Sequence, residues 1–154
     1  MGQPKQLLSY RGQTLLRRMA EVALALPLHE VWVVLGAQAK QMYPSLEGLP
    51  VPIVENHDWQ HGMGSSLAQL GEQTDALLVM LVDQPYVTPV LLERIMAAYQ
   101  HGAPLVAARY SDTLGVPALF DRSFFPQLAQ FPPQKGMRAL LQAEKARVLA
   151  IPFP

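Results

Sequence analysis

Short apolar runs and amphipathic segments alternate along this chain. The most apolar run is Leu77–Val82, whose six residues show no polar alternation and therefore predict a strand covered on both faces. Asp83 follows this run directly, and Pro85 ends the predicted strand because proline cannot donate to a sheet ladder. In Leu15–Leu26, by contrast, apolar residues recur at helical spacing with charged residues between them, which predicts an amphipathic helix that ends at Pro27.

The same patterns continue through the whole chain and predict strands that alternate with helices. This alternation indicates an α/β fold in which a mainly parallel sheet lies between helices, within a single domain over residues 1–154. The predicted strands are Glu30–Gly36, Val51–Glu55, Ala76–Val82, Ala103–Arg109, Val116–Phe120 and Arg147–Pro152, with a loop at Tyr110–Gly115. The predicted helices cover residues 15–26, 37–43, 65–72, 90–100, 122–131 and 137–145.

The composition describes a globular chain without a strong electrostatic bias. Of its 154 residues, 50% are hydrophobic and 16% are charged, with 12 basic and 12 acidic side chains. A balanced charge gives no reason to expect nucleic acid or an anionic membrane as a partner. Cysteine is absent, which excludes disulfides and thiolate chemistry, and no apolar run reaches the roughly 20 residues that span a bilayer. We therefore expect a cytoplasmic protein.

Polar residues collect in loops that should follow the strands, at the sheet edge where open α/β proteins bind ligands. Asp83 lies at such a strand end, where a carboxylate is equally well explained as a magnesium ligand or as a cap on the next turn. Lys5 suits a point-charge contact to a phosphate, although a solvated terminal lysine is the commoner explanation. Lys135 and Arg138 flank a predicted helix start, which fits either a second phosphorylated substrate or ordinary surface charge.

A loop rich in small residues precedes the predicted helix 65–72. Its two glycines allow the backbone to approach a ligand closely, and its two serines fall at a helix N-terminus, which favours an anion or the polar edge of a base. The alternative is that one serine only caps the helix. The candidate nucleotide-binding residues of this loop are Gly62, Met63, Gly64, Ser65 and Ser66.

Four segments share their order and spacing with a known family over nearly the whole chain. They are Met1–Leu8, which contains Met-Gly-Gln-Pro-Lys, Gly62–Leu67 (Gly-Met-Gly-Ser-Ser-Leu), Leu81–Pro85 (Leu-Val-Asp-Gln-Pro) and Gly115–Phe120 (Gly-Val-Pro-Ala-Leu-Phe). Together they resemble the MobA-like nucleotidyltransferases, in particular the molybdenum cofactor cytidylyltransferase branch. The resemblance implies a three-layer Rossmann-like fold and the Mg²⁺-dependent transfer of CMP from CTP, or of a nucleotide from a related NTP, to molybdopterin with release of pyrophosphate.

The resemblance also implies roles for individual residues. Lys5 and Asp83 would be catalytic, since Lys5 would contact the triphosphate and Asp83 would bind magnesium. The loop 62–66 would hold the nucleotide base, with Ser66 at its polar edge. Lys135 and Arg138 would face the pterin. The resemblance is also compatible with a protein partner in molybdoenzyme maturation.

Two departures from the family pattern shape our expectations. Members begin with a strand and a glycine-rich loop before the Met-Gly-x-x-Lys element, and they continue past the last strand to a second metal carboxylate. We therefore expect a partial domain that lacks the first strand and the C-terminal segment and has impaired activity. Two alternatives stay open: a non-catalytic nucleotide-binding module, or a nucleotidyltransferase of the same fold that acts on a sugar or alditol phosphate.

Overall fold

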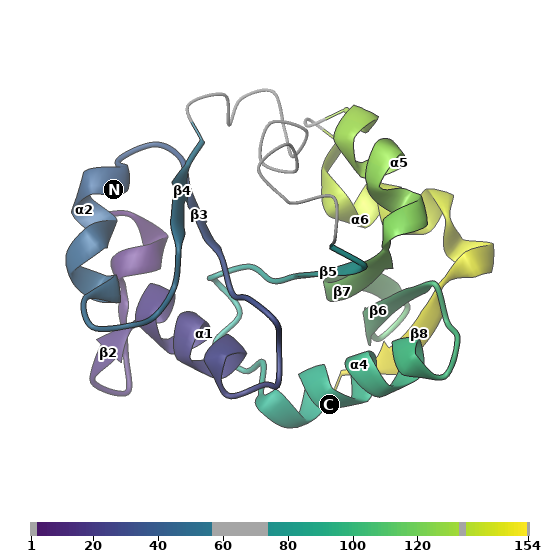
Figure 1. Ribbon diagram of the computed structural model, residues 1–154, viewed down its shortest axis with the longest axis horizontal. Coiled ribbons are helices and arrows are strands. Elements are labelled where there is room, and N and C mark those ends of the chain that lie inside the picture. The colour runs from purple at the N-terminus through teal and green to yellow at the C-terminus, as the bar shows by residue number, and fades with distance from the viewer. Residues whose placement is uncertain (1–2, 57–73, 133–134, 154) are drawn as a thin grey trace. The chain divides into compact units, whose positions relative to one another are not determined.

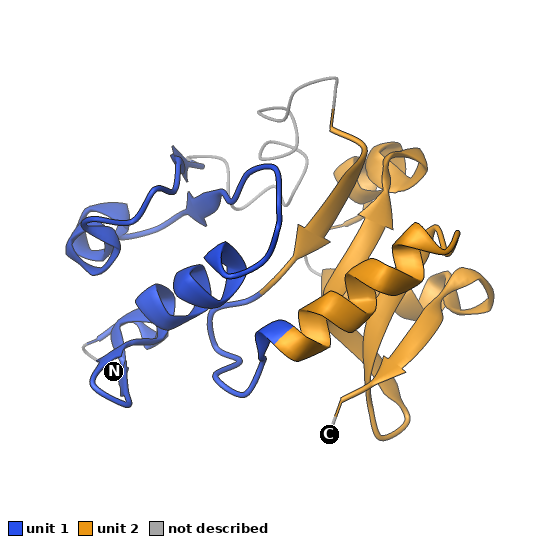
Figure 2. Ribbon diagram, turned by 60° about the horizontal axis from the view of Figure 1, so that its bottom comes forward, with its two compact units in different colours: residues 1–57, 81–89 blue, residues 58–80, 90–154 orange. Residues whose placement is uncertain are grey.

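The computed structural model describes residues 3–56, 74–132 and 135–153 of the chain. The chain divides into two compact units, which are coloured separately in Figure 2. Unit 1 consists of Met1–His57 with Leu81–Pro89, and unit 2 consists of Asp58–Met80 with Val90–Pro154. Each unit has its own elements and is described by itself.

Unit 1 contains a short hairpin, an amphipathic helix and a two-stranded parallel sheet (Figure 1). Thr14 caps the helix, because its hydroxyl accepts a hydrogen bond from the Arg17 backbone N–H at 3.2 Å. The elements are η1 (Lys5–Leu7), β1 (Ser9–Tyr10), β2 (Gln13–Thr14), α1 (Leu15–Leu24), β3 (Val33–Leu35), α2 (Ala39–Met42), η2 (Tyr43–Leu46) and β4 (Ile53–Glu55).

The apolar face of α1 forms the core of unit 1 together with β3, α2 and η2. This core is the cluster Leu16, Ala20, Leu35, Ala39, Met42 and Leu46, against which Leu7, Val33, Leu49, Val51 and Val82 pack. Residues i and i+4 of α1 lie on one face, which explains why Leu16 and Ala20 are both buried. Because Leu7 and Val82 pack on the same cluster, two segments distant in the sequence are anchored to one core.

Unit 2 is built on a mixed four-stranded sheet with the order β5-β7-β6-β8. Strand β7 runs antiparallel to both of its neighbours, whereas β6 and β8 pair in parallel. Figures 1 and 2 show α5 and α6 on one side of this sheet and α4 on the other. The elements are β5 (Ala76–Val79), α4 (Pro89–Gln100), β6 (Leu105–Tyr110), β7 (Thr113–Asp121), η4 (Arg122–Phe124), α5 (Phe125–Gln130), α6 (Gly136–Ala143), η6 (Lys145–Arg147) and β8 (Leu149–Pro152).

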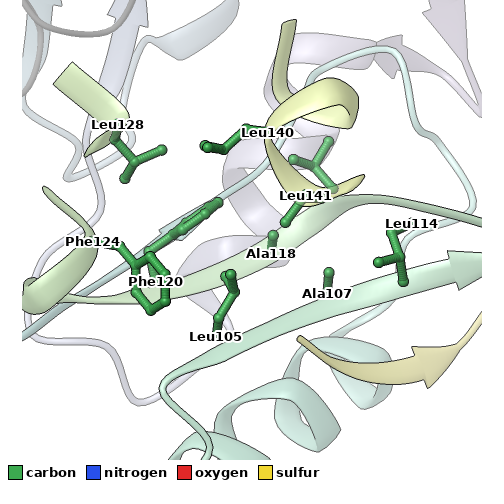
Figure 3. Close-up of a cluster of buried hydrophobic side chains, with 10 residues drawn as sticks. Leu105, Ala107, Leu114, Ala118, Phe120, Phe124, Leu128, Leu140 and Leu141 are labelled. Atoms are coloured by element: carbon green, nitrogen blue, oxygen red, sulfur yellow. The ribbon is translucent and has the colours of Figure 1, made fainter. Parts of the chain in front are cut away.

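The core of unit 2 fills the space between the sheet and helices α5 and α6. In Figure 3, Phe120 of β7 and Phe124 of η4 lie among leucines from the two helices and from β6, and their rings meet at 6.4 Å between centroids. Burying one phenylalanine side chain contributes about 1.5–3 kcal/mol, so these two rings hold the helices on the sheet. The cluster comprises Leu105, Ala107, Leu114, Val116, Ala118, Phe120, Phe124, Leu128, Leu140 and Leu141.

The structure confirms the α/β class and corrects three predictions of detail. The sheet predicted as mainly parallel is mixed in unit 2, because β7 runs antiparallel to both of its neighbours. The apolar run predicted as the strand Ala76–Val82 forms a strand only over Ala76–Val79, and this strand is half-buried at the edge of its sheet rather than covered on both faces. Within the described residues, its hydrogen bonds go to β7 alone and end at Val79, so the strand stops short of Asp83. The predicted loop Tyr110–Gly115 is a two-residue turn, because Ser111 adopts a φ of 54° that reverses the chain at once.

Candidate functional site

Asp83 lies in a pair of turns that follow β5, on a segment with several anchors. Val82, just before it, packs on the unit 1 core, and Val87, just after, has no exposed surface. The Val87 N–H donates to the Gln84 carbonyl at 3.1 Å. Arg18 Nε of α1 donates to the Pro85 carbonyl at 3.0 Å. The carboxylate of Asp83 is therefore presented to solvent from a backbone held on both sides.

Lys5 begins the single turn η1, which precedes the hairpin. The Leu8 N–H donates to the Lys5 carbonyl at 3.1 Å, and Gln3 Nε2 donates to the Leu7 carbonyl at 3.2 Å, which closes the turn from both ends. Leu7 packs on the unit 1 core, while the side chain of Lys5 is exposed. The structure thus places Lys5 and Asp83 in one compact unit, on segments anchored to the same core cluster.

Lys135 and Arg138 lie at the start of α6, and both side chains are exposed. The Lys135 N–H donates to the Pro132 carbonyl at 3.1 Å, and α6 is held by Leu140 and Leu141 in the core of unit 2. The structure therefore assigns these two cations to unit 2, separately from Lys5 and Asp83 of unit 1. The predicted base-binding residues, which lie outside the described residues, are Gly62, Met63, Gly64, Ser65 and Ser66.

Asp83 has the chemistry of a magnesium ligand without being part of a complete protein cage. Magnesium keeps several waters and is commonly held by one or two carboxylates together with substrate phosphates. Within the described residues, no group of three or more histidine or acidic side chains gathers closely enough to bind a metal. A single exposed carboxylate on a fixed turn therefore fits a cation that a nucleotide helps to hold.

A second carboxylate of unit 1, Glu55, ends β4 and was not singled out from the sequence. Its side chain accepts a hydrogen bond from the Tyr43 hydroxyl, and this bond is the main reason why the pKa of Tyr43 is raised, with burial and the charge of Glu55 adding to the effect. The only signal in the sequence was position, since Glu55, like Asp83, follows an apolar run. The bond to Tyr43 fixes Glu55 as a structural partner of η2.

The described part of the chain contains no helix with both the length and the apolar character needed to cross a bilayer.

The α/β scaffold of the chain presents Lys5 and Asp83 from two segments anchored to one core, and a cation and a carboxylate of this kind suit a phosphorylated ligand with its metal ion. The model of the MobA-like NTP transferase domain matches residues 1–148. The chain belongs to this nucleotidyltransferase family.

Comparison with individual proteins agrees with this assignment. The chain is 36% identical to the nicotine blue oxidoreductase of Paenarthrobacter nicotinovorans over 136 residues, which are 82% of this chain and 66% of that protein. It resembles the crystal structure of Rv0371C from Mycobacterium tuberculosis in complex with manganese, with a TM-score of 0.84, 29% identity, and coverage of 98% of this chain and 83% of the other. It shares its fold with molybdopterin-guanine dinucleotide biosynthesis protein A from Archaeoglobus fulgidus, with a TM-score of 0.67, 17% identity, and coverage of 98% and 76%.

The length that the chain shares with its curated relatives is limited. It spans 66% of the nicotine blue oxidoreductase and about a quarter of the next two relatives, at 24% and 22%. Those two are the bifunctional protein GlmU of Halorhodospira halophila and a bifunctional IPC transferase and DIPP synthase of Rubrobacter xylanophilus. The family assignment therefore supports the general class of reaction, nucleotidyl transfer, but it does not identify the particular substrates.

Proposed function

We propose that this protein is a nucleotidyltransferase that transfers CMP from CTP to the phosphate of molybdopterin. The observation that carries the proposal is Asp83, an exposed carboxylate on an anchored turn inside the segment that matches the MobA-like family. One relative of the same fold is named for molybdopterin-guanine dinucleotide biosynthesis, which supports the choice of acceptor. The choice of CTP as the nucleotide donor rests on the resemblance of the segments around Asp83 and Gly62 to the cytidylyltransferase branch.

The proposed reaction is an in-line displacement at phosphorus. A phosphate oxygen of the acceptor attacks the α-phosphorus of the nucleotide, and a new P–O bond forms. The bond between this phosphorus and the bridging oxygen to the β-phosphate breaks, so pyrophosphate leaves with the electron pair. A divalent cation, when bound, neutralises charge on the phosphates, and Asp83 would hold it as Mg²⁺. Lys5 would place its ammonium against the triphosphate.

The remaining roles belong to residues outside unit 1 or outside the described residues. We assign the nucleotide base to the loop residues 62–66 and the pterin side to Lys135 and Arg138.

The test is Mg²⁺-dependent release of pyrophosphate from CTP in the presence of molybdopterin, measured for the full chain and for Asp83→Asn. We expect Asp83→Asn to lower turnover about 10²-fold or more, as removing one preorganised electrostatic group at a transition state does. Asp112→Asn is the matched control, since Asp112 is also an exposed carboxylate in a turn, in unit 2. Unchanged turnover in Asp83→Asn would contradict the role given to Asp83.

Other outcomes of the same experiment point to the alternatives. Binding of CTP by the unmodified chain without pyrophosphate release supports a non-catalytic nucleotide-binding module. Release of pyrophosphate only with a sugar phosphate or alditol phosphate as acceptor supports a different nucleotidyltransferase of this fold. Replacement of CTP by GTP or ATP tests the base in the same assay.

A second candidate function is an oxidoreductase activity, favoured by the 36% identity with a relative that is named nicotine blue oxidoreductase. This candidate predicts that the chain changes the oxidation state of the dye in that relative's name when an external electron donor or acceptor is supplied. Absorbance of the dye, followed with and without the chain, measures it directly. The activity would not depend on CTP and would survive Asp83→Asn.

A further inference from the structure

Two arginines and two tyrosines of unit 1 converge beside the turn that carries Asp83. The guanidinium carbons of Arg11 and Arg18 each lie 5.2 Å from the centroid of the Tyr10 ring, so they are no further apart than twice this distance. The Tyr86 ring meets the Tyr10 ring edge-on, with 6.2 Å between centroids and an interplanar angle of 88°. We call these four residues the arginine–tyrosine cluster.

The cluster is tied to the Asp83 turn by its own hydrogen bond. Arg18 donates through Nε to the carbonyl of Pro85, two residues after Asp83, and Tyr86 is the next residue. That bond uses only the Nε–H of the Arg18 guanidinium and leaves the Nη–H groups of its fork available as donors. A ligand held by Arg18 would therefore lie next to the turn from which Asp83 reaches solvent.

The backbone at Arg11 is costly for an arginine. Arg11 and Gly12 form the two-residue turn between β1 and β2, with φ angles of 51° and 86°. Such turns favour Asn-Gly or Gly-Gly, because both central residues need positive φ. A bulky residue in this conformation is a reason to look for a function of its side chain. Here the side chain lies over the Tyr10 ring.

The charges of the cluster are not neutralised within the described part of the chain. Neither Arg11 nor Arg18 has a carboxylate within ion-pairing distance there. The neighbouring Arg17 behaves differently, since its Nε lies 3.2 Å from the Glu21 carboxylate and its Nη1 donates to the Glu47 carbonyl at 2.8 Å. Arg17 is therefore held in contacts within unit 1. Arg11 and Arg18, by contrast, both lie near the Tyr10 ring and have no anionic partner among the described residues.

These groups match a particular class of ligand. Guanidinium groups bind phosphate through paired N–H donors, and an exposed tyrosine offers a surface for a planar ring. Tyr86 is 71% exposed, whereas tyrosine side chains are usually buried to a larger extent. We propose that the arginine–tyrosine cluster recognises the acceptor substrate as a phosphate monoester carried by a planar ring system, with Arg11 and Arg18 on the phosphate and Tyr86 on the ring. This inference rests on the proposed transfer reaction for the identity of the site as an acceptor site.

A purely structural role for the cluster makes a different prediction. If the arginines only fasten the hairpin to α1 and to the Asp83 turn, their removal lowers stability and leaves binding of phosphorylated rings unchanged. Binding and stability must therefore be measured on the same variants.

The test uses flavin mononucleotide as the probe, because it carries a phosphate monoester on a planar ring, and riboflavin as the probe without the phosphate. Quenching of flavin fluorescence on titration with the full chain, at saturating CTP and Mg²⁺, gives both dissociation constants. We expect flavin mononucleotide to bind at least ~10-fold more tightly than riboflavin, as charge-assisted hydrogen bonds to phosphate require. In the double variant Arg11→Gln, Arg18→Gln this preference should disappear, and Tyr86→Ala should weaken both probes.

Lys40→Gln is the control, since Lys40 is an exposed cation of unit 1 outside the cluster, and it should leave both constants unchanged. Thermal unfolding identifies any variant that fails to fold, and if the double variant does so, the single Arg11→Gln variant replaces it and should show a reduced preference for flavin mononucleotide. Equal binding of the two probes by the unmodified chain, no binding of either, or a preference that survives the double variant would overturn the proposal.

The proposed function is followed separately through CTP binding and pyrophosphate release in the same samples. Loss of the phosphate preference with intact CTP binding in the double variant supports the cluster as a separate acceptor site. A chain that prefers flavin mononucleotide but neither binds CTP nor releases pyrophosphate would refute the proposed function and leave the ligand class of the cluster standing.

Discussion

The hydroxyl of Tyr99 in α4 donates a hydrogen bond to Oδ1 of Asp121 at the end of β7, with 2.8 Å between the two oxygens. The other carboxylate oxygen of Asp121 accepts from the Ser123 backbone N–H at 3.0 Å and so caps η4. One carboxylate therefore links a helix on one side of the unit 2 sheet to the chain that leads to α5. Burial, and after it the bond to Asp121, raises the pKa of Tyr99.

Removing the Tyr99 hydroxyl tests this link. We expect Tyr99→Phe to lower the free energy of unfolding by about 0.5–1.5 kcal/mol, the usual net contribution of one hydrogen bond. Urea denaturation followed by circular dichroism measures the change. Tyr86→Phe is the control, since Tyr86 is 71% exposed and its hydroxyl should contribute nothing measurable to stability. Equal stability of Tyr99→Phe and the unmodified chain would show that the bond is not formed in solution.

Asp121 also makes the stability of the protein sensitive to acid. The Ser123 backbone N–H, followed by the Tyr99 hydroxyl, holds the pKa of Asp121 below its ordinary value of 3.8. A carboxyl with a lowered folded pKa stabilises the protein above the ordinary value, and this contribution disappears as the pH falls through the folded pKa. Asp121→Asn should therefore be less stable at neutral pH and lose less stability on acidification below about pH 4. Unfolding midpoints measured from pH 7 to pH 2 test this, with Asp112→Asn as the control. The prediction is wrong if Asp121→Asn and the unmodified chain lose stability equally on acidification.

The core under α6 should be sensitive to the loss of side-chain volume. Leu141 has no exposed surface and lies in the cluster around Phe120. Leu141→Ala should lower the free energy of unfolding by about 2–5 kcal/mol, because the cavity adds to the lost transfer free energy. Leu149→Ala removes the same atoms from a side chain that is 46% exposed and should cost much less. Similar costs for the two variants in the same denaturation assay would argue against the packing of α6 on the sheet.

The role proposed for Lys5 predicts a change in nucleotide affinity. An exposed ammonium contributes a screened point charge, so Lys5→Gln should raise the KM for CTP about 3–10-fold, with a smaller difference at high salt. Lys40→Gln removes an equivalent exposed cation of unit 1 and should leave KM unchanged. An increase in KM that does not depend on salt would point away from a charge contact.

The sequence predicted those features that depend on neighbouring residues. The spacing of apolar residues and the stop at Pro27 identified α1 to within two residues of its end at Leu24. The run Leu77–Val82 predicts a fully covered strand, whereas the structure has a half-buried strand at the sheet edge. The prediction is wrong because composition cannot tell a central strand from an edge strand. Strand order is set by contacts between distant segments, and for that reason β7 between β5 and β6 could not be anticipated.

The same limit applies to the candidate sites. Asp83 and Lys5 could be selected because each stands in a motif that is continuous in the sequence. The arginine–tyrosine cluster could not, since the Arg18–Pro85 bond that brings it together joins residues 67 positions apart. Its one local signal was an arginine before Gly12 in a two-residue turn, where asparagine or glycine is the usual choice.

Gly115 of β7 has a neighbour that explains why it carries no side chain. A Cβ placed there would lie 3.2 Å from Cε2 of the Tyr110 ring. This ring cannot easily move, because its hydroxyl donates to the Val116 carbonyl and its face packs on Phe153 at 4.8 Å between centroids. Alanine in place of glycine usually stabilises a chain by about 0.4–1 kcal/mol through the unfolded state, whereas overpacking costs about 1–3 kcal/mol. We therefore expect Gly115→Ala to be destabilising in chemical denaturation.

A double-mutant cycle separates the two contributions. Tyr110→Leu removes the ring that the new methyl group would meet, although it is itself destabilising because the bond to the Val116 carbonyl is lost. If the clash dominates, Gly115→Ala in the Tyr110→Leu background becomes neutral or stabilising, and the coupling free energy exceeds about 1 kcal/mol. If Gly115→Ala costs the same in both backgrounds, the ring does not restrict position 115, and the cost comes from the backbone of β7 instead.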